Sequence, residues 1–233
     1  MSKTPARAYR YFDLIVGGFV AVLLCSNLIG PGKVALVGGI AFGVGNIFFP
    51  ISYIFGDVLT EVYGYARARR AIWAGFAAMS FATLMSWSVR TLPADPSEPW
   101  NETLQPALDV VFGNTGRIVV ASVVAFVVGD FVNSYVMARM KVLTQGRHLW
   151  TRTIGSTIVG QGCDSLLFYP IAFYGVWRNE RLLTVLLTNW WLKVGVEVLM
   201  TPLTYWIVNV LKRAEHEDFM DVDTDFNPFR LDA

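Results

Sequence analysis

Carboxylate side chains occupy unusual positions in this sequence, because several of them interrupt or end long apolar runs. The segment FFPISYIFGDVLTEVYGYARARR, at residues 48–70, carries Asp57 and Glu61 four residues apart, just before a cluster of arginines. On a helix this spacing places both carboxylates on one face. A charge near the centre of a bilayer costs about 2.5–3.5 kcal/mol, so each acid needs a partner or a function. Two interpretations stay open: an interfacial ion pair with Arg67–Arg70, or part of a binding or gating site.

Two further apolar runs carry polar residues at helical spacing. Asp130 lies in VGDFVNSYV, where Asn133 shares its helical face. The run IVGQGCDSLLFYP places Gln161, Asp164 and Phe168 on one stripe. A single amide or hydroxyl in such a position can simply join two helices. An aspartate beside the amide favours a binding site instead.

A third run, NWWLKVGVEVLMTP, contains a basic and an acidic residue four positions apart. Lys193 and Glu197 can pair with each other on one helix, and that purely structural interpretation stays open. Asn189 and Trp190 lie one turn earlier on the same run. The alternative is that all of these side chains face a shared cavity.

The donor and acceptor chemistry of these residues predicts the kind of ligand. Carboxylates and carboxamides accept adjacent N–H donors, and flanking aromatic rings stack on a flat ring. A neutral nitrogen heterocycle is therefore the expected ligand, and the absence of a glycine-rich phosphate loop argues against phosphorylated ligands. The predicted substrate-binding residues are Asp57, Glu61, Asn133, Gln161, Asp164, Trp190, Lys193 and Glu197. We expect no cofactor, no metal site and no catalytic residue, since His148 and His216 lie outside the apolar runs.

Composition indicates that a membrane positions these side chains. The 233 residues are 54% hydrophobic and 16% charged, with a net charge of +1 that argues against a nucleic-acid partner. Cys25 and Cys163 lie inside apolar runs and are expected to be packing residues. We predict an all-α integral membrane protein, one domain over residues 1–233, with a second helix that is bent or discontinuous at Pro50. The six expected spans cover about 11–29, 36–58, 70–90, 116–138, 153–176 and 183–210.

Lysine and arginine predict the orientation of this bundle. They gather in the amino-terminal segment, around residues 67–70, at residues 139–152 and in the carboxyl-terminal segment after the last span. By the positive-inside rule both termini are cytoplasmic, including the tail at 211–233. Residues 91–115 then form an external loop, which we expect to be at least partly ordered. The tail is expected either to be disordered or to dock on the inner face through its FNPF sequence.

Five stretches of the chain are similar to the queuosine precursor transporter family, also described as vitamin-uptake-like or domain of unknown function 165. They are SNLIGPGK (26–33), FPISYIFGDVLTEVYGYARARR (49–70), GQGCDSLLFYPIAF (160–173), KVGVEVLMTPLTYWIVNVLKRAE (193–215) and EDFMDVDTDFNPF (217–229). The resemblance covers nearly the whole chain except the outer loop. It implies a multi-pass inner-membrane importer of 7-deazaguanine bases such as the 7-cyano and 7-aminomethyl forms.

Other functions stay open at this point. The chain could be the substrate-binding membrane component of a vitamin or nucleobase uptake system that needs a partner ATPase. An intramembrane enzyme is disfavoured, because no metal cluster or Ser–His pairing stands inside a span. An ion channel would need a homo-oligomer to build a ring of carboxylates, and a homo-oligomer stays open. The sequence does not indicate the preferred base or the energy source.

Overall fold

The computed structural model describes residues 9–28, 34–37, 40–43, 49–113 and 116–230. Its described helices are α1 (Phe12–Leu28), α2 (Phe49–Tyr63), α3 (Tyr65–Thr91), α4 (Trp100–Phe112), α5 (Gly116–Leu143), α6 (Leu149–Phe173) and α7 (Asn179–Glu215). Two short strands, β1 (Val34–Val37) and β2 (Ile40–Gly43), lie between α1 and α2. Helices therefore dominate the fold, as predicted, and a β-hairpin is added to them.

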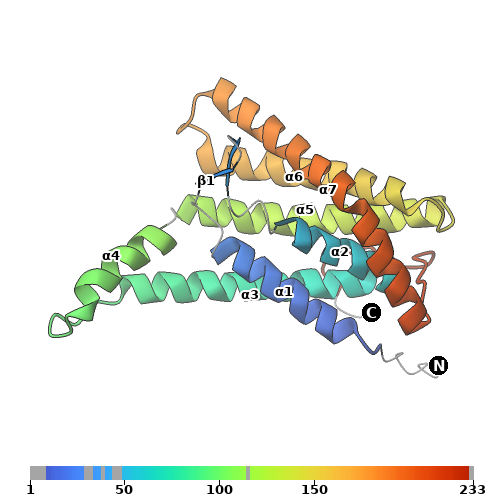
Figure 1. Cartoon of the computed structure of the whole chain (residues 1–233), viewed down its shortest axis with the longest axis horizontal. Helices are drawn as coiled ribbons and strands as arrows, with labels where there is room; N and C mark the ends of the chain where they lie inside the picture. The colour runs from blue at the N-terminus through green and yellow to red at the C-terminus, as the bar shows by residue number, and fades with distance from the viewer. Residues whose placement is uncertain (1–8, 29–33, 38–39, 44–48, 114–115, 231–233) are drawn as a thin grey trace.

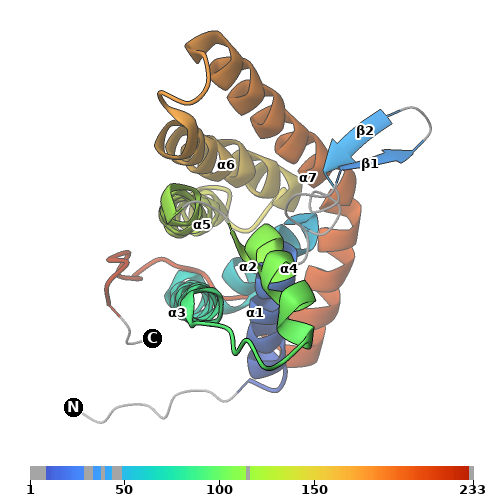
Figure 2. The same ribbon diagram turned by 90° about the vertical axis from the view of Figure 1, so that its left-hand side faces the viewer.

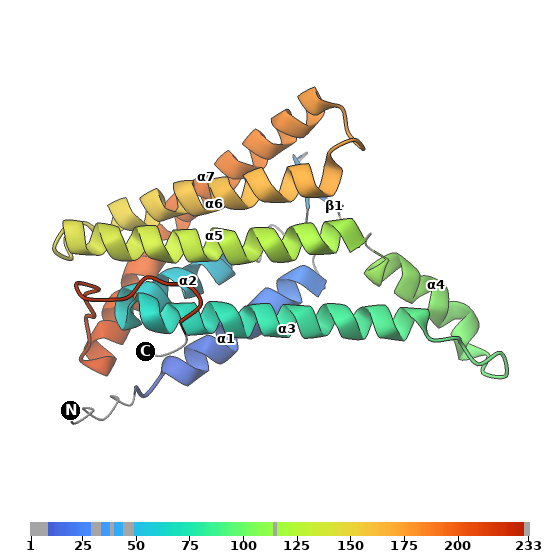
Figure 3. The same cartoon turned by 180° about the vertical axis from the view of Figure 1, so that it is seen from behind.

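The long helices run back and forth between two ends of the molecule (Figures 1 and 3). One end, here called the terminal end, holds the start of α1, the α2–α3 junction, the α5–α6 connection, the end of α7 and the described part of the tail. The opposite end, here called the α4 end, holds α4 and the α6–α7 connection. Figure 2 shows the hairpin projecting from the side of the bundle. This alternation is the arrangement that short connections between antiparallel helices produce.

The predicted helix over residues 36–58 is wrong in its first part. Val34–Val37 and Ile40–Gly43 pair as antiparallel strands, with Val37 opposite Ile40. Glycine is a poor helix former, and Gly38 and Gly39 separate two short β-prone runs in the sequence, a pattern typical of a hairpin. α2 begins at Phe49, so Pro50 lies in its first turn, where the missing amide hydrogen costs little. The break predicted at Pro50 is thus the start of a 15-residue helix.

Close approach of α5 and α6 depends on two glycines. A Cβ added to Gly160 would lie 2.7 Å from the Cβ of Asn133, and one added to Gly129 would lie 3.0 Å from the Cβ of Asp164. These distances leave no room for a larger side chain at either position. The two glycines therefore bring the polar stripes of α5 and α6 against each other.

Length and apolar character mark this chain as a membrane protein. Within the described residues, three helices are long and apolar enough to cross a bilayer: Tyr65–Thr91, Gly116–Leu143 and Asn179–Glu215. The shorter helix Phe12–Asn27 is also apolar. Large apolar side chains such as Trp87, Leu199 and Trp206 are exposed on the outer faces of the bundle. Exposed apolar surface of this extent fits contact with lipid.

The tail folds back onto the terminal end of the bundle. Both carboxylate oxygens of Asp221 accept a hydrogen bond from the amide of Tyr65, at 3.1 and 3.2 Å, and so satisfy an amide in the first turn of α3. Phe219 packs against Gly64, which has a φ of +83° that few other residues adopt. The tail thereby fixes the sharp junction between α2 and α3.

The FNPF sequence docks on the bundle, which was one of the two expectations for the tail. Arg69 donates to the carbonyl oxygen of Asn227 at 2.6 Å, and the indole of Trp73 donates to that of Pro228 at 2.7 Å. The ring of Phe226 lies against those of Tyr65 and Tyr135. Residues 216–230 therefore form an ordered strap across α3 and α5.

The end of α7 also binds the segment just before α1. The carboxylate of Glu215 accepts hydrogen bonds from the backbone amides of Arg10 at 3.0 Å and Tyr11 at 2.7 Å. It accepts a third from the hydroxyl of Tyr63 at 3.0 Å. A single side chain at the end of α7 thus joins the segment before α1 to the end of α2.

Candidate functional site

A cavity of about 250 Å³ lies between six of the helices and is called the main cavity below. It extends from the middle of the bundle toward the α4 end, since Asn27 near the end of α1 and Ser122 near the start of α5 both line it. Its other lining residues are Leu23, Ser52, Tyr53, Met79, Phe126, Asp130, Gln161, Asp164, Phe168, Tyr169, Asn189, Leu192, Lys193 and Val196. The polar stripes of α5, α6 and α7 therefore face one shared space.

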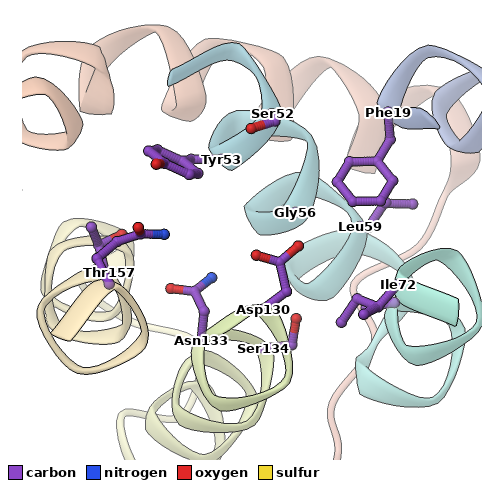
Figure 4. A pocket seen from close by; sticks show the side chains of 12 residues that line it. Phe19, Ser52, Tyr53, Gly56, Leu59, Ile72, Asp130, Asn133, Ser134 and Thr157 are labelled. Atoms are coloured by element: carbon purple, nitrogen blue, oxygen red, sulfur yellow. The ribbon is translucent and has the colours of Figure 1, made fainter. Parts of the chain in front are cut away.

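A smaller inner pocket adjoins the main cavity (Figure 4). Its volume of about 10 Å³ is room for about one water molecule. Ser52, Tyr53, Asp130 and Gln161 line both spaces. The first turn of α2 thus meets the middle of α5 and α6 here, and Asp130 and Gln161 stand at the boundary between the two spaces.

Several buried acceptor atoms at this place have no donor. Asn133 donates from Nδ2 to Asp57 Oδ1 at 3.1 Å, but its own Oδ1 has no hydrogen-bond partner among the described residues. The same holds for Oε1 of Gln161, whose side chain is almost fully buried. Leaving a buried acceptor unpaired costs about 1–3 kcal/mol. Gln161, which lines both spaces, is therefore suited to accept an N–H group from a ligand in the main cavity, whereas Asn133 faces only the inner pocket.

An ion pair crosses the main cavity between α6 and α7. Lys193 Nζ lies 2.5 Å from Asp164 Oδ2, and both side chains are about three-quarters buried. Lys193 therefore pairs across helices with Asp164 and not with Glu197, four residues along its own helix. The pair leaves a positive and a negative group together on the cavity wall.

Glu61 lies at the centre of a buried ion cluster at the terminal end. Arg152 binds both carboxylate oxygens, with Nε–Oε2 at 2.7 Å and Nη2–Oε1 at 2.8 Å, and Lys212 Nζ lies 2.5 Å from Oε1. Lys141 joins the cluster and also binds Asp218 of the tail. Burial raises the pKa of Asp218, but hydrogen bonds from Lys141 and Lys212 outweigh it and lower this pKa below its ordinary value.

The partners of Glu61 differ from the arginines that the sequence places nearest to it. They come from α5, α6 and α7 and not from Arg67–Arg70. Among the described residues Glu61 lines neither the main cavity nor the inner pocket. The cluster ties four helices and the tail together on the side of the cavity that faces the terminal end.

Three more of the predicted site residues lie behind the cavity wall. Trp190 packs its ring on Gly162 and donates to the carbonyl oxygen of Ile158 at 2.9 Å. Asp57 and Glu197 are fully buried, and neither lines a cavity within the described part of the chain. The predicted residues that do line a cavity are Asn133, Gln161, Asp164 and Lys193.

The structure adds lining residues that the predicted set leaves out. Tyr53 on α2, Tyr169 on α6 and Asn27 on α1 all face the main cavity. Tyrosines in apolar runs resemble ordinary packing residues, so the sequence offers no signal for them. Asp130 and Phe168 stand on the polar stripes and could have been found from their spacing.

Taken together, these features define a class of protein. Several apolar helices surround a buried polar cavity of small-molecule size, and a buried ion cluster lies between that cavity and the terminal end. No group of His, Cys, Asp and Glu that could hold a metal occurs in the described part of the chain. A multi-pass membrane transporter for a small molecule has this construction.

Comparison with known proteins gives the family. Residues 43–207 match the family model described as "Putative vitamin uptake transporter", and the chain belongs to this family. The resemblance seen in the sequence motifs is thereby confirmed. The family is one of transporters, so the expectation that the chain is not an enzyme is confirmed as well.

Relatives in three bacteria carry related names. The chain is 31% identical over 189 residues to the "Probable queuosine precursor transporter" of Bacillus subtilis (strain 168), covering 81% of this chain and 80% of that protein. It is 28% identical over 174 residues to the "Queuosine precursor transporter" of Escherichia coli (strain K12), covering 72% and 73%. A "Probable queuosine precursor transporter" of Haemophilus influenzae is 28% identical over 130 residues, covering 56% and 51%. No solved structure matches the chain.

Proposed function

We propose that this chain imports queuosine precursors, 7-deazaguanine bases such as the 7-cyano and 7-aminomethyl forms, across the inner membrane. One observation carries the proposal: the unpaired carboxamide oxygen of Gln161 stands at the main cavity, which Tyr53 and Phe168 also line. The ring N–H or the amine of such a base would supply the missing donor. The aromatic side chains would stack on its flat ring. The names of the relatives point to the same substrates.

The size of the main cavity suits a small base. Ligand pockets commonly measure about 300–1,000 Å³, and about 250 Å³ lies just below that range. A bicyclic base is of suitable size for this space. The Asp164–Lys193 pair could additionally bind a polar substituent of the base, because it offers both a donor and an acceptor.

In this proposal six helices, α1, α2, α3, α5, α6 and α7, form the membrane bundle, and both termini are cytoplasmic. α2 spans about 22 Å at 1.5 Å per residue, so it enters the membrane only partway and begins at the cavity. The basic residues of the sequence gather at the terminal end, which supports placing that end in the cytoplasm. The lipid bilayer and the base are then the partners of the chain.

A strain that lacks its own transporter and cannot synthesise the bases provides the test. Expression of this chain should restore accumulation of labelled 7-cyano-7-deazaguanine and of queuosine in tRNA, compared with an empty vector. Unlabelled 7-aminomethyl-7-deazaguanine should compete. Adenine, which lacks adjacent ring N–H and amine donors, should compete poorly. Equal competition by adenine would contradict the proposed recognition.

Reconstitution of the purified chain decides whether it needs a partner ATPase. Exchange of labelled base across proteoliposomes that contain this chain alone should be faster than across empty vesicles. Restoration of import in the cell, combined with no exchange in proteoliposomes, would instead identify the chain as the binding component of a larger uptake system.

A further inference from the structure

Two buried acids lie together behind the wall of the inner pocket. Asp57 on α2 is 0% exposed and Glu197 on α7 is 1% exposed. Each has one carboxyl oxygen, Asp57 Oδ2 and Glu197 Oε1, with no hydrogen-bond partner among the described residues. The two helices pack against each other, and of all charged groups Glu197 acts most strongly on Asp57.

No cation compensates these two acids. In the part of the chain that the structure describes, no lysine or arginine nitrogen lies within 4.0 Å of either carboxyl group. The other charged groups that act most strongly on Asp57 are Glu61 on its own helix and Asp130 on α5, which are also acids.

The lysines and arginines on the surrounding helices form ion pairs with other acids or stand at the helix ends. Arg152 of α6, Lys141 of α5 and Lys212 of α7 bind Glu61, and Lys193 of α7 binds Asp164. α1 carries Asp13 as its one charged residue, in its first turn, and the arginines of α3 stand in its first two turns and its last turn. None of these residues neutralises the two acids.

An ionised carboxylate buried without a cation is one of the most costly groups in a protein. Two carboxylates on packed helices cannot both be ionised without further cost, whereas one proton removes one of the two charges. We propose that Asp57 and Glu197 together hold one proton, and that this proton enters the cell together with the imported base. The proton is taken up from the outer side and released inside, and the base is chemically unchanged. The inference rests on the proposed function, because it concerns the driving force of the same import.

The shared proton would control the packing of α2 on α7. With one of the two carboxyl groups protonated, the two helices can pack as observed. Loss of the proton to the cytoplasm places two like charges between the helices and pushes them apart. Both helices continue to the ion cluster around Glu61 and Lys212, so their separation would loosen the terminal end of the bundle. Proton release is thus linked to opening on the cytoplasmic side.

One side chain connects the acid pair with the cavity. Asn133 donates to Asp57 Oδ1, while its own Oδ1 is the unpaired acceptor at the inner pocket. Asn133 and Gln161 line the same inner pocket, so a base bound at Gln161 and a proton bound at Asp57 both act on this pocket. Such a shared contact gives each ligand an influence on the affinity of the other.

Proteoliposomes that contain the purified chain and a trapped pH dye provide the test. Labelled 7-cyano-7-deazaguanine is added outside, with the membrane potential held at zero. The expected result is acidification of the lumen that depends on the base. An acidic exterior should drive accumulation of the base by about tenfold for each unit of pH difference, since one pH unit corresponds to about 1.4 kcal/mol per proton. Base movement with neither effect would overturn the proposal and leave the proposed function intact, while absence of base exchange would count against the proposed function itself.

Neutral variants identify the residues that hold the proton. Asp57→Asn and Glu197→Gln keep the shape of the protonated acid but cannot release a proton. Base exchange that remains in these variants should run without proton movement and without response to the pH gradient. Glu180→Gln, on the exposed first turn of α7, is the matched control and should behave as the wild type. Loss of proton movement in Asp130→Asn together with its retention in Asp57→Asn would place the proton on the cavity wall and overturn the assignment.

Infrared spectroscopy tests the same pair without transport. The wild type and Glu180→Gln should show the carbonyl stretching band of a buried protonated carboxyl group. Asp57→Asn and Glu197→Gln should each lose or shift this band, because the two groups share one proton. An unchanged band in both variants would show that the pair holds no proton.

Discussion

Gln161 allows a direct test of base recognition by a single side chain. Its Oε1 is buried, has no donor and lies at the boundary of both spaces. Gln161→Ala should weaken binding of labelled 7-cyano-7-deazaguanine about 10- to 100-fold, because a lost hydrogen bond to a buried group costs about 1–3 kcal/mol. Equilibrium binding to the purified protein measures the change. Folding should be preserved, since the substitution removes an unpaired acceptor.

Val159 provides the control on the same helix. It is 44% exposed on the outer face of α6, so Val159→Ala should leave the affinity for the base unchanged. Equal loss of binding in both variants would mean that any substitution in α6 weakens binding. Recognition by Gln161 would then be contradicted.

Substitution of Glu61 should lower the stability of the protein, because Glu61 holds the buried ion cluster together and does not line a cavity in the described part of the chain. Glu61→Gln leaves Arg152 and Lys141 buried without their carboxylate, and breaking a buried ion pair costs about 3–5 kcal/mol. We expect the midpoint of thermal unfolding in detergent to fall by on the order of 10 °C. Glu180→Gln removes only an exposed pair and should change the midpoint little. Normal stability with lost base binding would instead identify Glu61 as a ligand residue.

Residue types and spacing predicted part of the candidate site. The stripe of Gln161 and Asp164 was evident from its helical spacing, and both residues line the main cavity. The partners of the charged groups were not predictable, because they depend on how distant helices pack. Arg152 binds Glu61 across 91 positions of sequence, and Lys193 prefers an acid on α6 to the one on its own helix.

At the scale of secondary-structure elements, the sequence indicates helices better than it indicates interruptions. Five predicted spans coincide in position with the helices α1, α3, α5, α6 and α7, because long apolar runs leave few alternatives to a helix in a membrane. Of these, α3, α5 and α7 are long and apolar enough to cross a bilayer. The segment before Pro50 is different: it is apolar enough for a span but rich in glycine, and part of it forms the hairpin. Apolar character and backbone preference conflict there, and the count of apolar residues does not resolve the conflict.

The α2–α3 junction gives a prediction about the strap formed by the tail. A Cβ at Gly64 would lie 2.2 Å from Cδ1 of Phe219, and the φ of +83° is itself unfavourable for other residues. Gly64→Ala should therefore lower the unfolding midpoint and release the tail. Thermal unfolding and protease cleavage within residues 216–230 would show both effects.

Gly146 provides a comparison with backbone strain alone. Its φ of +75° is also positive, but nothing lies within 4 Å of an added Cβ, so Gly146→Ala carries only backbone strain of about 1–2 kcal/mol, whereas Gly64, with a ψ of 166°, adds the contact with Phe219 to a backbone conformation that is essentially restricted to glycine. Gly64→Ala should be clearly more destabilising. Adding Phe219→Ala to Gly64→Ala should recover part of the difference. Equal effects of the two single variants would show that the contact with Phe219 is unimportant.

For the whole molecule, the proposed orientation predicts the side on which each connection lies. Reporter fusions after residues 63, 143 and 215 should be active in the cytoplasm, and fusions after residues 100 and 179 should be active outside. The physical reason is the excess of lysine and arginine at the terminal end. A cytoplasmic signal at residue 100 would contradict the orientation and with it the direction of import.

The hydrogen bonds that Glu215 accepts from the segment before α1 have a consequence for the synthesis of the protein. Its carboxylate binds the backbone just before α1, across 205 positions of sequence. The ribosome makes α1 before Glu215, so the first helix gains this contact only after the end of α7 has been made. Chains that end early leave the amides of Arg10 and Tyr11 without this acceptor. A product that ends before Glu215 therefore holds the start of its first helix less firmly than a product that includes Glu215.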